Sequence, residues 1–217
     1  MRIQTERLLL KEITENDFSP LFDLMTNGEV KKTYLVPDFE NENAFMKTFL
    51  HLKKLSQDEN GHTAGIFLGN ELIGLFHKVD TVGDRVEVGY AIHPRFQNQG
   101  YATEALQAGI RYFFEKGFCE VYAGAFQTNP ASLRVMEKAG MQKTKMKASV
   151  RYRGKTHSCV YYSVKAKRND FERKEGEQHE KNHRDRMSRK REEHVLSRSA
   201  SKNGNPALLF GHDVLER

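Results

Sequence analysis

The chain has 217 residues, of which 38% are hydrophobic and 29% are charged, and its formal net charge at pH 7 is +6. This length is enough for one well-buried domain with an appendage. No stretch approaches the ~20 apolar residues of a membrane span, and the opening MRIQTERLLL lacks the long apolar core of a signal peptide. We therefore expect no membrane partner.

Cysteine usage indicates the compartment. The two cysteines, Cys119 and Cys159, sit inside apolar, strand-like stretches, so a disulfide framework is not expected and a reducing cytoplasm fits better. Cysteine and histidine do not cluster at metal-ligand spacing, so we expect no structural metal.

Charge and composition change near Lys165. Residues 1–164 carry 21 Lys+Arg and 19 Asp+Glu, whereas residues 165–217 carry 14 and 10. Large apolar residues are almost missing from the start of this second segment, so it cannot bury a core of its own. We expect a folded domain over 1–165 and a charged C-terminal extension over 166–217, either disordered or loosely helical.

The first half of the expected domain alternates between strands and helices. Residues 7–13 (RLLLKEI) predict a strand, and Asn16 or Asp17 can cap the helix that follows. Apolar residues at i, i+4 and i+7 from Phe45 predict an amphipathic helix. Residues 62–79 then predict a hairpin whose Gly-Asn pair supplies the turn.

The second half continues the alternation, and Gly or Pro marks the ends of several elements. The expected elements are a strand over 86–92, a helix over 102–116, a strand over 119–126, a short helix over 131–139, and two last strands over 145–152 and 156–164.

The stretch FQNQGYATEA (96–105) places a polar, glycine-containing loop directly before a good helix. The first N–H groups of a helix are unpaired and lie at the positive end of its dipole, and a glycine lets the backbone approach a ligand, so this loop predicts a phosphate site. Neither G-x-x-x-x-G-K-[ST] nor G-x-G-x-x-G occurs, which argues against a P-loop or a Rossmann site. The alternative is that Gly100 only starts a helix.

The same stretch resembles a known family. QNQGYA (97–102) is similar to the Q/R-x-x-G-x-G/A motif of the GNAT superfamily of N-acetyltransferases. VEVGYAIHPRFQNQGYATEALQAGIRYFF, NPASLRVMEKAGM and TERLLLKEITENDF resemble its Rim-type branch, which acetylates N-terminal amines of ribosomal proteins. The resemblance covers about residues 3–165. It implies an α/β (α+β) GNAT fold, in which helices flank a central mixed, mostly antiparallel, splayed sheet.

The resemblance also implies a co-substrate and its contacts. In this family the loop holds the pyrophosphate of acetyl-coenzyme A, backbone N–H groups of the splayed strand polarise the thioester, and an asparagine contacts the pantetheine arm. Carried over to this sequence, the residues that bind acetyl-coenzyme A are Ala91, Ile92, Gln97, Asn98, Gln99, Gly100, Tyr101, Ala102, Thr103, Asn129 and Ser132. No metal is implied.

Two residues are candidates for proton transfer. With a strand period of 2, Glu87, Gly89 and Ala91 share one face, where a carboxylate could deprotonate an incoming amine. The alternative for Glu87 is a surface or salt-bridged glutamate. Ser132 is the candidate that helps protonate the leaving thiolate. Many members carry a tyrosine acid where this chain has Met136, which leaves that role open between Ser132, water and direct thiolate release.

These observations favour a cytoplasmic acetyltransferase that acts on a primary amine, with a protein N-terminus such as that of a ribosomal protein as the first candidate. A small amine such as a polyamine or aminoglycoside is the second, and Ser158, where the branch often has an acid, keeps it open. Two non-enzymatic alternatives are a coenzyme-binding regulatory module and a ribosome or nucleic-acid binder that works through the C-terminal tail. A monomer and a homodimer fit equally.

Overall fold

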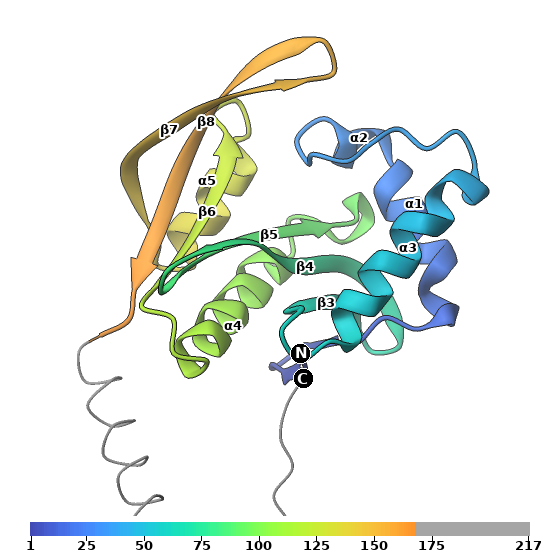
Figure 1. Ribbon diagram of the computed structural model, residues 1–217, viewed down its shortest axis with the longest axis horizontal. Helices are drawn as coiled ribbons and strands as arrows, with labels where there is room; N and C mark the ends of the chain where they lie inside the picture. Colours follow the sequence, from blue (N-terminus) through green and yellow to red (C-terminus); the bar gives the residue numbers. More distant parts are fainter. Residues whose placement is uncertain (168–217) are drawn as a thin grey trace, which may run out of the picture. The chain divides into compact units, whose positions relative to one another are not determined.

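The computed structural model describes residues 1–167, and most of the extension expected over 166–217 lies outside the described residues. Figure 1 shows the arrangement of the described elements. They are, in chain order, β1 (Ile3–Gln4), β2 (Leu8–Lys11), η1 (Glu15–Asp17), α1 (Phe18–Thr26), α2 (Gly28–Lys31), α3 (Glu42–Gln57), β3 (Thr63–Leu68), β4 (Glu71–Val82), β5 (Arg85–Ile92), η2 (Pro94–Phe96), α4 (Tyr101–Glu115), β6 (Glu120–Phe126), α5 (Pro130–Lys138), β7 (Gln142–Tyr152) and β8 (Lys155–Lys165). No helix within these residues has the length and apolar character to cross a membrane.

The strands form one sheet of eight in the order β1-β2-β3-β4-β5-β6-β8-β7. All neighbouring pairs are antiparallel except β5 and β6, which are parallel and joined through α4. A parallel pair needs such a crossover, so the strand–loop–helix–strand order read from the sequence is confirmed here. The expected fold, a mostly antiparallel mixed sheet flanked by helices, is confirmed as well.

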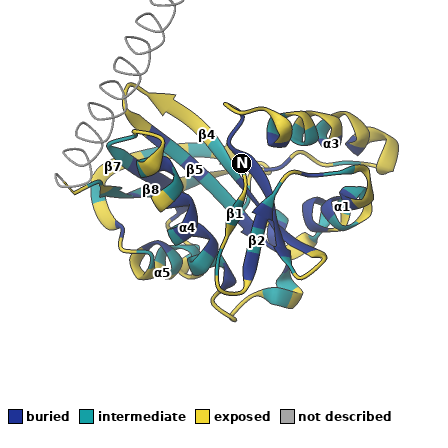
Figure 2. Cartoon of the chain, turned by 90° about the horizontal axis from the view of Figure 1, so that it is seen from below, coloured by how far each residue is buried: buried dark blue, intermediate teal, exposed yellow. Residues whose placement is uncertain are grey.

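Helices cover both faces of the sheet. One core cluster joins α4 to the inner residues of β2 to β6 and includes the fully buried Phe113. The other joins α1 and α3 to the opposite face through Phe45, Phe49 and Leu75. Figure 2 shows the buried stripe along α4 against the sheet. Val86 and Val88 belong to the first cluster and Ala91 to the second, which confirms the two faces predicted for β5.

Three local features differ from the sequence prediction. The capping box before α1 is formed by Thr14 and Asp17 around the short helix η1, so the Asp17 carboxylate bonds Thr14 and not the start of α1. The short elements β1 and α2 were missed. β7 also starts earlier than expected, at Gln142, and a bulge between Lys143 and Lys147 interrupts its pairing with β8.

The hairpin formed by β7 and β8 reaches across to the segment that follows α2 (Figure 1). Its two-residue turn, Arg153-Gly154, has positive φ at both positions (49° and 74°), which suits the twist of a tight hairpin. The Tyr152 hydroxyl lies 3.0 to 3.2 Å from three carbonyls of residues 31–36. Arg153 pairs with Asp38 at 2.6 Å. These contacts join the hairpin tip to residues 31–38.

Candidate active site

The parallel pair β5 and β6 separates part-way along. Its pairing runs from Arg85↔Glu120 to Glu87↔Tyr122 and stops there. Beyond Glu87 the two strands diverge and line a cleft of about 410 Å³, with residues 88–92 on one wall and Gly124 and Ala125 on the other. The splay inferred from the family resemblance is therefore present.

This cleft passes through the sheet. On the α4 side it is lined by the residues before and at the start of α4 and by the first turns of α5. On the opposite side its lining residues include Gly89, Glu29 and Tyr34, of which the last two belong to α2 and the segment after it. Two molecules can therefore enter from opposite faces of the sheet and meet between β5 and β6.

The α4 mouth of the cleft is a loop with a strained backbone. Asn98 and Gly100 both have positive φ, 61° and 85°. No amide of residues 98–103 donates a hydrogen bond within the part of the chain that the structure describes. These donors stand at the positive end of the α4 dipole, and their arrangement fits a pyrophosphate.

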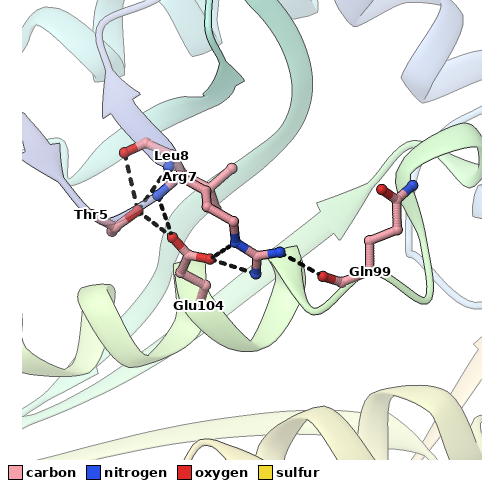
Figure 3. A network of polar contacts seen from close by, with 5 residues as sticks. All are labelled: Thr5, Arg7, Leu8, Gln99 and Glu104. Atoms are coloured by element: carbon pink, nitrogen blue, oxygen red, sulfur yellow. Dashed lines mark hydrogen bonds and ion pairs between the residues drawn. The ribbon is translucent and has the colours of Figure 1, made fainter.

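Arg7 holds this loop from the side (Figure 3). Its guanidinium donates to the Gln99 carbonyl at 2.9 Å and pairs with the Glu104 carboxylate at 2.6 Å. It also lies 4.6 Å above the centre of the Tyr101 ring. Thr5 bonds the same carboxylate. Burial alone would raise the pKa of Glu104, but the hydrogen bonds from Thr5 and Arg7 lower it, so the anchor stays ionised.

The β5 wall of the cleft offers a backbone donor. His93 donates its amide to Ile73 in β4 at 2.8 Å. Because successive amides of a strand point to alternate edges, the Ile92 amide points to the other edge, where β6 has diverged. An N–H group fixed in this way can stabilise a carbonyl oxygen that gains charge.

Tyr90, Ser132 and Asn129 meet on the α5 wall. The Tyr90 hydroxyl lies 3.0 Å from Ser132 Oγ, and Asn129 accepts from the Ser132 amide at 3.2 Å, which caps α5. Burial raises the pKa of Tyr90 to about 12, although the Ser132 contact opposes the rise. Tyr90 therefore stays protonated at physiological pH. The sequence prediction missed it because it follows the core pattern of β5.

Glu87 lies at the last paired rung of β5 and β6, just below the point where the cleft begins. It is half-buried and does not line the cleft itself. Burial raises its carboxyl pKa, and the charge of nearby Asp80 raises it further. Burial is the main cause that raises the pKa values of Tyr122 and Tyr161, and the charge of Glu87 is the second. Glu87 therefore lies near these two tyrosines, on the sheet face opposite α4.

The far mouth of the cleft has a second polar pair that the sequence prediction missed. Tyr34 and His77 are 43 residues apart in sequence, and the Tyr34 hydroxyl lies 2.6 Å from His77 Nε2. Burial raises the pKa of Tyr34 and lowers that of His77. A methyl group at Gly89 would approach His77 Nε2 to 2.5 Å, so only glycine fits beside this pair.

The structure brings most predicted site residues together. Those that line the cleft are Ala91, Ile92, Gln97, Asn98, Gly100, Tyr101, Ala102, Thr103, Asn129 and Ser132. Gln99 and Glu87 do not line it: the first offers its carbonyl to Arg7, and the second lies one rung deeper. Among residues 1–167, no three His, Cys, Asp or Glu side chains are grouped to hold a metal ion.

Comparison with known proteins identifies the family. Residues 7–142 match the acetyltransferase (GNAT) domain. The chain belongs to the GNAT family of acetyltransferases. As a member, it is an acetyl-coenzyme A-dependent N-acetyltransferase. It is 30% identical to the uncharacterized N-acetyltransferase YoaA of Bacillus subtilis (strain 168), over 75% of this chain and 95% of that protein.

One further relative and one solved structure of similar fold are ribosomal-protein acetyltransferases. The ribosomal-protein-serine acetyltransferase of Escherichia coli (strain K12) is 29% identical over 52% of this acetyltransferase and 66% of that protein. The solved structure of RimL, a ribosomal L7/L12 alpha-N-protein acetyltransferase in complex with coenzyme A, superposes with a TM-score of 0.65 at 20% identity, over 76% of this chain and 98% of that one. At this identity the superposition shows the fold.

Proposed function

We propose that this acetyltransferase moves the acetyl group of acetyl-coenzyme A to the α-amino group of a protein N-terminus, with a ribosomal protein as the first candidate. The observation that carries the proposal is the cleft that crosses the sheet between β5 and β6. One end of this cleft, on the α4 side, is a loop of free amides, and the other end is the mouth beside α2. The names of the ribosomal-protein relatives support this choice of acceptor.

The residues divide the binding work between the two mouths. In this proposal the amides of residues 98–103 bind the pyrophosphate, while Asn129, whose Nδ2 has no partner within residues 1–167, binds a pantetheine amide. The Ile92 amide polarises the thioester carbonyl. The acceptor enters past Tyr34 and Glu29, whose carboxylate is paired with Lys32 at 2.7 Å.

Proton transfer follows from the same arrangement. The amine nitrogen attacks the carbonyl carbon, so a C–N bond forms and the C–S bond breaks. Glu87 takes the amine proton through water, because its carboxylate lies below the cleft and not in it. Ser132 passes its proton to the thiolate and takes one back from water, and the Tyr90 hydroxyl holds it in place for this. An α-amino group, with an ordinary pKa near 8, is deprotonated more easily than a lysine side chain near ~10.4.

An acceptor screen tests the proposal. Free thiol is followed with acetyl-coenzyme A and three acceptor sets: peptides with free N-termini, the same peptides with blocked N-termini and an internal lysine, and small polyamines or aminoglycosides. We expect turnover with the first set alone. Turnover with the third set would favour the small-amine alternative, and thiol release that needs no acceptor would contradict both.

We also propose that residues 1–165 are the catalytic domain and that residues 166–217 have a different role. We place the protein in the cytoplasm, whose reducing conditions suit its two free cysteines, Cys119 and Cys159. Every residue to which we give a catalytic or coenzyme-binding role lies before residue 133. A chain that ends at Lys167 should therefore acetylate a short peptide at close to the parent's rate. Loss of this activity on truncation would assign the extension to the catalytic fold.

A further inference from the structure

The hairpin of β7 and β8 has a charge that the rest of the described domain lacks. We call residues 142–165 the basic arm. It contains seven Lys+Arg and no Asp or Glu, whereas residues 1–141 contain 15 Lys+Arg and 19 Asp+Glu. A net-acidic body therefore carries a purely cationic arm at one end of its sheet, where β7 is the outermost strand.

Most of these cations have no partner. Arg153 pairs with Asp38 at the tip, and Lys165 lies opposite Glu120 in the register of β6 and β8. The other five side chains are exposed and make no ion pair or hydrogen bond to any residue that the structure describes. They are Lys143, Lys145, Lys147, Arg151 and Lys155.

Protection of a free sheet edge explains only part of this pattern. Lysines on an outer strand prevent edge-to-edge pairing with another molecule. Glutamates would serve equally, and surfaces normally mix both signs. The exclusion of every acid from 24 consecutive positions needs a second reason. Attraction of a polyanion supplies it.

The chemistry of the arm fits a phosphate backbone better than an acidic protein. Lysine is depleted from protein–protein interfaces, which favour aromatic residues, methionine and arginine. The one exposed large apolar side chain of the arm is Met146, so no apolar centre for a protein interface exists there. The arm's three tyrosines are buried or half-buried, which leaves none free to stack on single-stranded bases. The cations also follow a strand of 11 residues, or about 35 Å at 3.3 Å per residue.

The arm also lies next to the acceptor mouth. Its tip is bonded to residues 31–38, and Thr33 and Tyr34 of this segment line the cleft. A partner held along the arm is thereby kept beside the entrance that the acceptor uses.

We propose that the basic arm is a docking surface for the phosphate backbone of helical RNA, so that an acceptor N-terminus on an RNA-bound protein is presented to the cleft. The choice of RNA rests on the proposed function, in which the acceptor is a ribosomal protein. Backbone contacts by point charges are independent of sequence and weaken steeply with salt.

Fluorescence anisotropy with a labelled RNA duplex of about 20 base pairs tests the proposal on the full chain, between about 50 and 200 mM salt. The arm variant combines Lys143→Gln, Lys145→Gln and Lys147→Gln. The matched control combines Arg2→Gln, Lys47→Gln and Lys54→Gln, which are also exposed and remove the same charge from the acidic body. We expect the parent and the control to bind alike, and the arm variant to lose about 10-fold or more in affinity and on the order of three units of salt slope.

Other outcomes overturn the proposal. They are no binding by the parent at the lowest salt, equal losses in both variants, or tighter binding to poly-glutamate or a DNA duplex than to RNA. If the arm variant aggregates, Arg151→Gln with Lys155→Gln replaces it, because neither position lies in the lysine-rich bulge. Binding is measured without acetyl-coenzyme A, so the result of the RNA-binding experiment does not depend on the result of the acceptor screen. All variants should acetylate a short peptide at the parent's rate.

Discussion

The hydroxyl of Tyr90 lies 3.0 Å from Oγ of Ser132, which links the middle of β5 to the first turn of α5 across the cleft. Either oxygen can be the donor in this contact, but Tyr90 has a pKa raised to about 12 by burial and keeps its proton. We infer that Tyr90 orients Ser132 and does not act as a base.

Tyr90→Phe should lower kcat about 10-fold and leave the KM for acetyl-coenzyme A within about twofold, because the lost contact orients a group used in the transition state. In Ser132→Ala the same tyrosine change should cost little more, since the two residues act as a unit. Tyr112→Phe is the control: it removes a hydroxyl bonded to His62, away from the cleft. Independent, additive losses from the two changes would contradict the coupling.

The second prediction concerns the loop anchor. Arg7→Ala removes the contacts to the Gln99 carbonyl and the Glu104 carboxylate, so the loop amides lose their fixed positions. The KM for acetyl-coenzyme A should rise about 10-fold while kcat changes little. Arg7→Lys should recover part of the loss, because lysine restores the positive charge but not the planar set of guanidinium donors. Arg95→Ala, which breaks an exposed pair with Glu71, is the control. A change in thermal stability alone would leave Arg7 a structural residue only.

The loop and its helix were predictable because their signals are local. Gly100 precedes a run of apolar residues at helical spacing, and the alternation in β5 gives its two faces. The contacts that complete the site are not local: Arg7 and Gln99 are 92 residues apart, and Tyr34 and His77 are 43 apart. α2 has four residues, too few for a periodic pattern. No single sequence window contains such pairs, so the sequence indicated the coenzyme side of the cleft better than the acceptor side.

The third prediction concerns Gly100, which has a φ of 85°. A Cβ there would lie 3.3 Å from Arg7 Nη2, and an L-residue in this backbone region costs roughly 1–2 kcal/mol. Gly100→Ala should therefore weaken acetyl-coenzyme A binding about 10-fold, measured by calorimetry. Gly117→Ala is the matched control: Gly117 has a φ of 96°, and a Cβ there meets no atom within 4 Å. The control should lose comparable stability and keep its affinity. Equal affinities in the two variants would contradict a phosphate site at the loop.

The last prediction concerns Glu87, whose carboxyl pKa is raised by burial and by Asp80. If Glu87 is the base, kcat/KM should rise with pH as its carboxyl ionises, at a pH above the ordinary value of 4.5. Asp80→Asn removes the like charge and should shift this rise to lower pH. Glu87→Gln should abolish the rise, lower turnover of an N-terminal peptide about 10²-fold at neutral pH, and recover part of it at high pH, where the amine loses its proton unaided.

Stability separates this role from a structural one. A carboxyl whose pKa is raised on folding stabilises the fold below its unfolded pKa, and this contribution is lost as the pH rises through its folded pKa. Glu87→Gln removes the cost of ionising a half-buried group, so the variant should be at least as stable as the parent at pH 7 and should lose this advantage in acid. Urea unfolding at the two pH values measures it. A variant that is less stable at pH 7, with an unshifted rate profile, would show that Glu87 holds the diverging strands together and transfers no proton.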